Sequence, residues 1–225
     1  TATSGGTWTL TTTALVAGSY TVSAVQVDSA GNTSASSTAT SIVIDDSTPS
    51  TPLAADLMST SDTGTSPTDN VTYDDTPTFT GTAPSDHFVF LSVGNGSTTS
   101  VYTYTTTAGL NWYITTNSLT DGTWTATVTH ADTAGNVSSA STATIVVTDT
   151  VTGSAPTIDL DVSSDTGTSS TDNVTSDTTP TWNGSSDADA YIVLSIADGV
   201  STSVFTTTAT SGGTWTLTTT ALVAG

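Results

Sequence analysis

Hydrophobic and polar residues alternate along most of the chain, and the alternation is strict in the segment TWTATVTH at 123–130. Neighbouring side chains of a strand point to opposite faces, so Trp124, Ala126 and Val128 share one face and the threonines share the other. Turn sequences rich in Gly and Asn follow such segments, as in GNGS at 94–97. The pattern therefore predicts short β-strands and shows no helical period.

Seven short strands are predicted within about 100 residues, at 56–60, 77–82, 87–93, 101–107, 112–117, 123–130 and 140–148. Such spacing is typical of a β-sandwich, so the predicted fold class is all-β, with Ig-like Greek-key sandwiches of about seven strands joined end to end by short linkers. Trp8, Trp112 and Trp215 are equivalent and are expected in the core, with a stacking platform for sugars as the alternative. Tyr20 and Trp124 open the penultimate strand, where a corner aromatic is expected.

The sequence repeats itself with a period of about 103 residues. Residues 1–18 return verbatim as 208–225, and a divergent copy lies half-way between them. The acidic stretch SDTGTSPTDN at 61–70 returns as SDTGTSSTDN at 164–173. The predicted domains are the C-terminal part of one repeat, a complete repeat and the N-terminal part of the next, at 1–46, 47–149 and 150–225. We expect these residues to be a window on a longer tandem array.

The charge of the chain restricts the classes of function that we expect for it. The chain has 20 Asp, no Glu, no Lys, no Arg and no Cys, and its net charge is −20. Nucleic acid and anionic lipid are bound through Lys and Arg, so we expect no nucleic-acid partner and no direct membrane insertion. An apolar content of 34% with high charge is typical of disorder. Alternating Val, Ile, Thr and aromatic residues nevertheless favour a folded β protein.

Aspartates recur at equivalent positions, and the topology of an antiparallel sandwich places many of them where repeats meet. The predicted groups are Asp62, Asp69 and Asp149 with Asp189 at one junction, and Asp45 with Asp86 and Asp132 at the other. Two such charges about 4 Å apart repel by about 1 kcal/mol in water, and more where water is excluded. Oxygen ligands without Cys favour Ca²⁺ over Zn²⁺ or copper. The alternative is ordinary turn chemistry, in which each Asp bonds its own backbone.

Two segments resemble the bacterial Ig-like tandem repeats of giant RTX-type and other large repetitive surface adhesins. SDTGTSPTDNVTYDDTPTFTG from Ser61 is similar to the family's acidic loop before a threonine–proline strand, and LTDGTWTATVTHADTAGNVS from Leu119 is similar to its strand ending in D-x-A-G-N. The resemblance implies an extracellular or cell-surface extender region that Ca²⁺ stiffens at the junctions. It implies neighbouring repeats as partners, together with other copies in a filament or matrix, and it adds Asn136 as a ligand.

The leading hypothesis is therefore a non-catalytic structural extender, and the alternative is a carbohydrate- or surface-binding module. An enzyme is disfavoured because neither histidine recurs: His87 aligns with Ala190, and His130 aligns with Gln26. The candidate Ca²⁺ ligands are Asp28, Asp45, Asp46, Asp62, Asp69, Asp86, Asp132, Asn136, Asp149, Asp165, Asp172 and Asp189.

Overall fold

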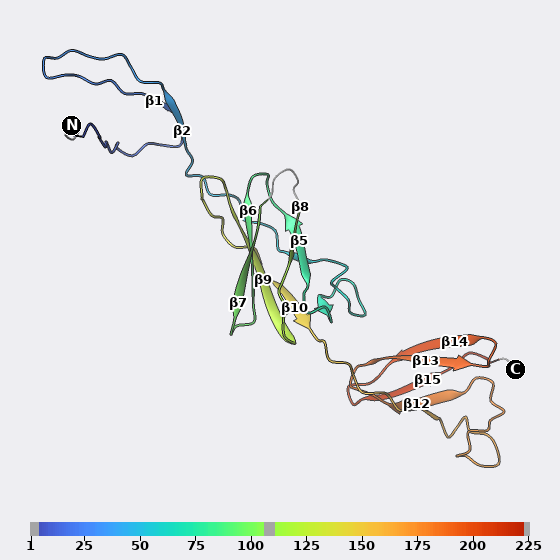
Figure 1. Ribbon diagram of the computed structural model, residues 1–225. Helices are drawn as coiled ribbons and strands as arrows, with labels where there is room; N and C mark the ends of the chain where they lie inside the picture. Colours follow the sequence, from blue (N-terminus) through green and yellow to red (C-terminus); the bar gives the residue numbers. More distant parts are fainter. Residues whose placement is uncertain (1–4, 106–110, 223–225) are drawn as a thin grey trace. The chain divides into compact units, whose positions relative to one another are not determined.

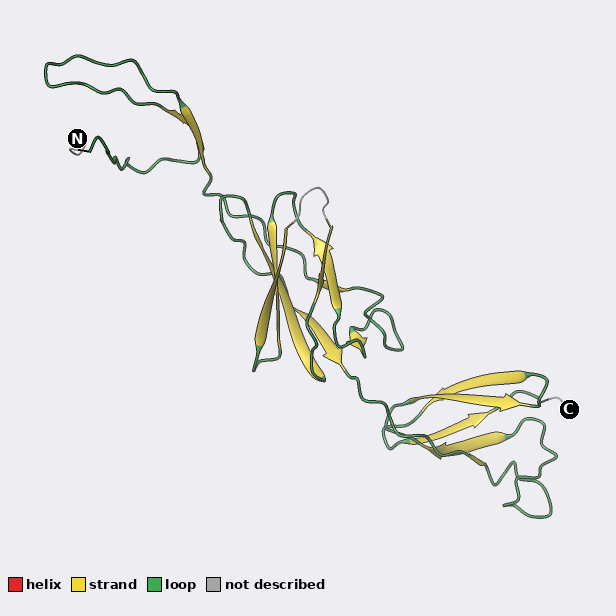
Figure 2. Ribbon diagram, in the orientation of Figure 1, coloured by secondary structure: helices red, strands yellow, loops and turns green. Residues whose placement is uncertain are grey.

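The computed structural model describes residues 5–105 and 111–222, which belong to two compact units, Thr1–Val151 and Thr152–Gly225 (Figure 1). The described residues form strands, turns and loops and no helix (Figure 2). None of them therefore provides a helix that could cross a membrane. The predicted all-β class is confirmed.

The first unit contains a complete sandwich of two sheets. One sheet has five strands in the order β4 (Val71–Thr72), β10 (Thr144–Thr148), β9 (Gly122–Ala131), β6 (Phe88–Gly94) and β7 (Thr99–Thr105). The other has three strands in the order β3 (Asp56–Leu57), β5 (Thr78–Thr82) and β8 (Asn111–Thr115). All neighbours are antiparallel except β4 and β10, which run parallel. We call this sandwich the middle repeat.

The core of the middle repeat follows from the alternation along its strands. On β9 the side chains of Trp124, Ala126 and Val128 are buried, and the threonines between them face outward or are half-buried. From the other sheet, Trp112 and Phe79 pack into the same cluster with exposed fractions of 1% and 0%. Burial of large apolar side chains is the main stabilising contribution in such a small domain.

A glycine opposite Trp112 and another opposite Trp215 make room for the indole rings. Gly81 is the cross-strand partner of Trp112, and a Cβ at Gly81 would come within 2.6 Å of the ring atom Cζ2. Gly184 has the same relation to Trp215, at 2.8 Å. The two pairs show that both sandwiches pack in one manner.

The second unit repeats much of this arrangement. One sheet has the order β11 (Asp159–Leu160), β12 (Thr181–Ser185) and β15 (Thr214–Thr218), and the other pairs β13 (Tyr191–Ala197) with β14 (Thr202–Thr208). Trp215 and Leu217 pack with Ile192 and Leu194 in its core. Residues 152–222 contain no counterpart of β9 or β10.

Residues 5–46 contribute a hairpin, β1 (Gly18–Val22) and β2 (Thr40–Ile44). The hydroxyl of Tyr20 donates to the carbonyl of Val16 at 2.8 Å, and the indole Nε1 of Trp124 donates to the carbonyl of Thr120 at 2.9 Å. Both bonds span four residues. The predicted corner aromatics are thus confirmed, and β1 is the counterpart of the first half of β9.

The structure corrects the sequence prediction at three places. Trp8 is 61% exposed, because residues 5–46 provide no counterpart of β5 to cover it. Strand β4 was not predicted, since two residues within a loop carry no periodicity. The last strand begins at Thr144 and not at residue 140. Before Thr144, the hydroxyls of Ser138 and Ser141 accept backbone N–H groups of β9, so side chains take the place of regular strand pairing there. Residues 106–107 of the predicted strand 101–107 lie outside the described residues.

Candidate metal centre

The acidic loop between β3 and β5 is folded back on itself and held by its own side chains. The hydroxyl of Ser61 donates to Asp74 Oδ2 at 2.8 Å, and the hydroxyl of Thr72 donates to the carbonyl of Ser61. Gly64 N–H donates to the carbonyl of Val71 at 3.0 Å across the loop. These bonds hold the loop in a conformation in which Asp62 is buried, with only 4% of its surface exposed.

One oxygen of this buried carboxylate has no partner among the described residues. Asp62 Oδ2 accepts the backbone N–H of Asn70 at 3.3 Å, whereas Oδ1 is buried and unbonded. Asn70 has a φ of 58°, a left-handed conformation that Asn tolerates. An unsatisfied buried polar atom is rare in a folded protein, and an absent ion or water is one of its ordinary explanations.

The second unit builds the same loop. Asp165 is 5% exposed, its Oδ2 accepts the backbone N–H of Asn173 at 3.3 Å, and its Oδ1 is again buried without a partner. Asn173 has a φ of 59°. Ser164 donates to Asp177 Oδ2 at 2.9 Å, as Ser61 does in the first loop. The two copies of this loop, which differ at one position in the ten-residue acidic stretch, thus present the same unpaired anionic oxygen.

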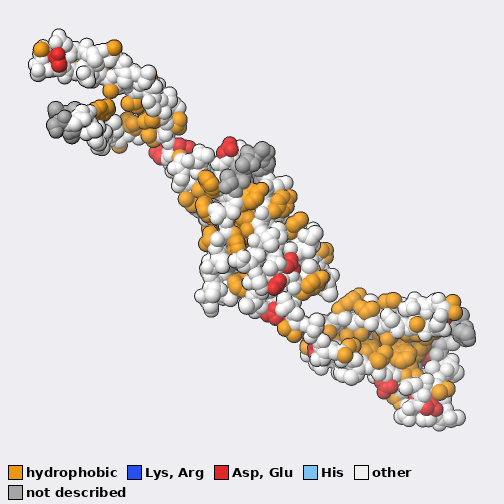
Figure 3. All heavy atoms as spheres, viewed as in Figure 1, with side chains coloured by type: hydrophobic (Ala, Val, Ile, Leu, Met, Phe, Trp, Pro, Cys, Tyr) orange, Lys and Arg blue, Asp and Glu red, His pale blue; other side chains and the backbone are white. Residues whose placement is uncertain are grey.

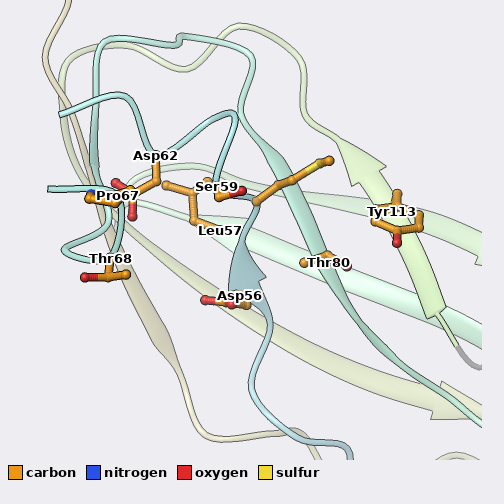
Figure 4. A pocket seen from close by; sticks show the side chains of 9 residues that line it. Asp56, Leu57, Ser59, Asp62, Pro67, Thr68, Thr80 and Tyr113 are labelled. Carbon is orange, nitrogen blue, oxygen red and sulfur yellow. The ribbon is translucent and has the colours of Figure 1, made fainter.

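Asp62 also lines a shallow cavity of about 370 Å³ (Figure 4). Asp56, at the start of β3, contributes a second carboxylate, and the loop contributes Pro67 and Thr68. The cavity wall also carries Tyr113 from β8, whose side chain is 50% exposed. The cavity lining therefore includes residues with carboxylate and hydroxyl side chains, which are among the ligand types that Ca²⁺ takes.

In the D-x-A-G-N turns, the aspartate carboxylate accepts hydrogen bonds from groups of the same turn. Asp132 Oδ1 accepts the backbone N–H groups of Ala134 and Asn136, both at 2.9 Å, and Oδ2 accepts the side-chain amide of Asn136 at 3.0 Å. The amide of Asn136 lowers the pKa of Asp132 most, and backbone donors add to this effect. Asp28 makes the same bonds, and the amide of Asn32 lowers its pKa. Turn chemistry accounts for both residues without a metal.

One contact joins this turn to the preceding linker. The side-chain amide of Asn136 donates to the backbone carbonyl of Asp45 at 3.0 Å, while it also bonds Asp132. The structure therefore brings together Asp45, Asp132 and Asn136 of the predicted set. Asp46 and Asp86 are exposed, and Asp86 has a φ of 59°.

The remaining candidates are exposed and mostly bond their own turns. Asp69 and Asp172 each accept the backbone N–H of the residue two positions later, at 3.1 and 3.2 Å. Asp149 does the same with Val151 at 3.0 Å, and Asp189 has a φ of 56°. Within 5–105 and 111–222, no three acidic or histidine side chains lie close enough together to hold a metal. The approach of Asp149 to Asp189 involves two units and stays a prediction.

Asp121 is a linker contact that the sequence analysis missed. Its Oδ1 accepts both the backbone N–H and the hydroxyl of Thr150, at 2.9 and 2.8 Å. In the second unit Asp187 Oδ2 accepts the backbone N–H of Ser154 at 3.0 Å. The sequence contained one indication of this contact: Asp121 stands at the position that Ala17 occupies in the preceding repeat.

Hairpin turns use aspartate and asparagine interchangeably. Asp198 Oδ1 accepts the backbone N–H groups of Ser201 at 2.7 Å and Val200 at 2.8 Å. These bonds, that of Ser201 most of all, lower the pKa of Asp198. Asn95 makes the same pattern in the middle repeat, with donors at 2.9 and 3.0 Å. Such aspartates are turn residues rather than ligands.

The two histidines lie together at one end of the middle repeat. Their ring centroids are 6.3 Å apart in an edge-to-face arrangement, and His130 is 3% exposed. Burial lowers the pKa of His130, and the neighbouring His87 lowers it further. Both ring nitrogens of His130 are buried without a partner in the described part of the chain, so the ring packs as a neutral group.

Comparison with known proteins gives two findings. A family model described as a bacterial Ig-like domain matches residues 1–46, 48–150 and 152–225. Among solved structures, the crystal structure of a tetra-tandem repeat in the extending region of a large adhesion protein is similar, with 24% identity and a TM-score of 0.34. The match covers 90% of this chain and 48% of that one, so this chain spans about half its length. None of the curated proteins matches the sequence.

Proposed function

Because the chain belongs to the bacterial Ig-like domain family, we propose that its repeats form a structural extender, a stalk or filament segment, of a bacterial cell-surface adhesin. The family match in three consecutive segments supports a tandem array whose immediate partners are neighbouring repeats of the same chain. The array lies outside the cell and catalyses no reaction. Its role is to hold a distal binding part away from the surface.

The proposal includes Ca²⁺ as the ion that rigidifies the array. The observation that supports it is the buried, unpartnered Oδ1 of Asp62, which recurs at Asp165. An anionic oxygen without a donor is a strong ligand for a hard cation, and Ca²⁺ accepts carboxylates, carbonyls, hydroxyls and water in irregular geometry. A bound cation neutralises the buried charge and ties the two sides of the acidic loop together.

The junctions are the second place where we propose Ca²⁺. Asp45, Asp132 and Asn136 are joined by hydrogen bonds in the first unit, Asp46 follows Asp45 in the linker, and Asp86 is exposed. At the second junction the proposed ligand is Asp149, with Asp189 of the following repeat. Ligands drawn from a linker and from a sandwich remove rotational freedom between repeats when one ion binds both.

The carbohydrate-binding alternative loses its principal support. Trp112, Trp124 and Trp215 are 1%, 7% and 3% exposed, so their rings are core and offer no face to a sugar. Stacking on a ligand requires an exposed aromatic face. Trp8 is 61% exposed, but residues 5–46 lack the strand that covers its equivalents Trp112 and Trp215.

Small-angle scattering on the 225-residue chain tests the extender, with millimolar Ca²⁺ against chelator. A rigidified array shows a greater maximum dimension and less flexible scattering in Ca²⁺. The double variant Asp62→Asn/Asp165→Asn separates loop sites from junction sites. Each single variant, Asp62→Asn and Asp165→Asn, has Asp198→Asn as its control for one lost charge. Identical profiles with and without Ca²⁺ in the parent chain would sink the calcium part of the proposal. A compact, non-extended profile in both conditions would sink the extender itself.

A further inference from the structure

The chain contains two Asn-Gly pairs, Asn95–Gly96 and Asn183–Gly184, and each is followed by serine. In such a pair the backbone nitrogen of the glycine can attack the side-chain carbonyl carbon of the asparagine, because no Cβ on the glycine shields that nitrogen. The attack requires a backbone that lets the side chain fold back onto the next residue, and water must reach the product. The structure places the two pairs in opposite surroundings.

The first pair lies in the four-residue turn between β6 and β7, and every residue of this turn is exposed. Gly96 has a φ of 85°, and a Cβ there would meet no heavy atom of the described residues within 4 Å. The backbone N–H groups of Ser97 and Thr98 donate to Asn95 Oδ1 at 3.0 and 2.9 Å. Donors on this oxygen stabilise the negative charge that develops when a nucleophile attacks the carbonyl carbon. The turn therefore activates the amide and leaves it open to water.

The second unit shows that an aspartate fits the same turn. Asp198 stands at the position of Asn95, and its Oδ1 accepts the backbone N–H groups of Val200 and Ser201 at 2.8 and 2.7 Å. The glycine that follows it has a φ of 88°. A carboxylate thus makes the same two bonds as the amide, and its charge strengthens them. Conversion of Asn95 to aspartate is therefore compatible with the hairpin.

The second Asn-Gly pair is protected by strand pairing. Asn183 lies in β12, and its backbone is paired with Asp159 on one side and with Thr216 on the other. Its side-chain Nδ2 donates to Asp161 Oδ2 at 2.8 Å. Pairing on both sides keeps the backbone extended, and in an extended strand the side chain points out of the sheet and not back onto the next nitrogen. The glycine nitrogen of this pair therefore cannot reach the side-chain carbonyl carbon while β12 is folded.

We propose that Asn95 is a site of spontaneous deamidation in the folded protein, with water as the co-reactant. The Gly96 nitrogen loses its proton and forms a bond to Asn95 Cγ. The bond between Cγ and Nδ2 breaks, and the amide nitrogen leaves as ammonia with that proton. Water then opens the cyclic imide: addition at Cγ gives aspartate, and addition at the backbone carbonyl carbon gives isoaspartate. No atom is oxidised or reduced.

Either product makes the β6–β7 turn acidic, as the β13–β14 turn already is. The added negative charge meets no Lys or Arg in this chain, and Figure 3 shows acidic side chains on both units. This inference goes beyond the extender function and does not depend on Ca²⁺.

Mass spectrometry of the full chain, stored at mildly alkaline pH, tests the site. Deamidation replaces an amide by a hydroxyl, and water labelled with heavy oxygen leaves its label in the product when the imide opens. Because the chain has no Lys or Arg, the peptides are released with a protease that cuts after aromatic residues, and Phe90 and Tyr102 flank the turn. Asn183 in the same sample is the internal control, and a chain unfolded in denaturant is the second control.

In the folded chain we expect at least several-fold more conversion at Asn95 than at Asn183. In the unfolded chain we expect similar conversion at both, since the two pairs share the sequence Asn-Gly-Ser. Equal conversion in the folded chain would overturn the inference, and so would an Asn95 that stays intact while the unfolded chain reacts. The variant Asn95→Asp supplies the aspartate product directly and should melt at the temperature of the parent. A clear loss of stability in this variant would show that the turn does not accept the product.

Discussion

The buried carboxylate of Asp62 makes the sharpest prediction about metal binding. We consider Asp62→Asn in the full chain, measured once in Ca²⁺ and once in chelator. Asparagine is nearly isosteric, and its carbonyl oxygen can still accept the N–H of Asn70 that now lies 3.3 Å from Oδ2. The substitution therefore removes the negative charge and one anionic ligand while it preserves the packing.

The effect of Asp62→Asn on the stability of the middle repeat should differ between chelator and Ca²⁺. Without metal, an unpartnered buried polar oxygen costs about 1–3 kcal/mol, so removal of its charge leaves the middle repeat as stable as the parent or more stable. With Ca²⁺ at about 100 times its dissociation constant, binding stabilises the folded parent by about 2.7 kcal/mol. For a domain of about 100 residues this corresponds to a rise in Tm of roughly 10–20 °C. The variant should lose most of that rise.

Scanning calorimetry of the full chain gives the required readout. Asp165→Asn is the parallel variant, because the same unpartnered oxygen occurs there in the second unit. Asp198→Asn is the control, since it removes one charge from an exposed turn. If Asp62→Asn and the parent gain the same increment from Ca²⁺, Asp62 is not a ligand. If the parent gains nothing, the metal hypothesis fails altogether.

Three further predictions concern packing, the linker and a turn. Gly81→Ala drives a methyl group into the buried ring of Trp112 and should cost about 1–3 kcal/mol in urea denaturation, and an unchanged midpoint would contradict the packing account. Asp121→Ala removes two bonds to Thr150 and should accelerate exchange of that amide in NMR, with no change expected if the linker is held otherwise. In Asp198, the pKa is lowered from the ordinary 3.8, so its stabilisation is present above that pH and is lost as pH falls through the lowered pKa. Asp198→Asn should keep the fold at neutral pH and make the loss of stability on acidification smaller than in the parent chain, and an equal loss in both would contradict a contribution from Asp198.

The sequence predicted the strands well because their periodicity is local. Strand β9 alternates from Thr123 to His130, and each apolar residue in its centre is buried as expected. Strand β4 was not predicted because its two residues are a strand only through their pairing with β10, which lies far away in the sequence. The prediction for Trp8 failed for the opposite reason. Trp8 has the local pattern of a core residue, but residues 5–46 contain no strand to cover it.

The candidate site was only partly predictable. Recurrence pointed to Asp62 and Asp165, but their burial depends on left-handed asparagines and on hydroxyls ten residues away. The turn motif at Asp132 was recognised, yet its carboxylate is satisfied by the turn itself. Hydrogen bonds within a turn and metal ligation draw on the same residue types, so spacing alone does not separate them.

The parallel pairing of β4 with β10 has a mechanical consequence. Val147 N–H donates to the carbonyl of Asn70 and Asp149 N–H to that of Thr72, both at 2.9 Å. Tension on an array pulls β4 toward its beginning and β10 toward its end, so the two strands are sheared past each other. Bonds in shear stretch together instead of opening one by one as in a zipper. In the proposed extender, the short strand that carries no periodicity thus lies where tension along the array would act on the repeat.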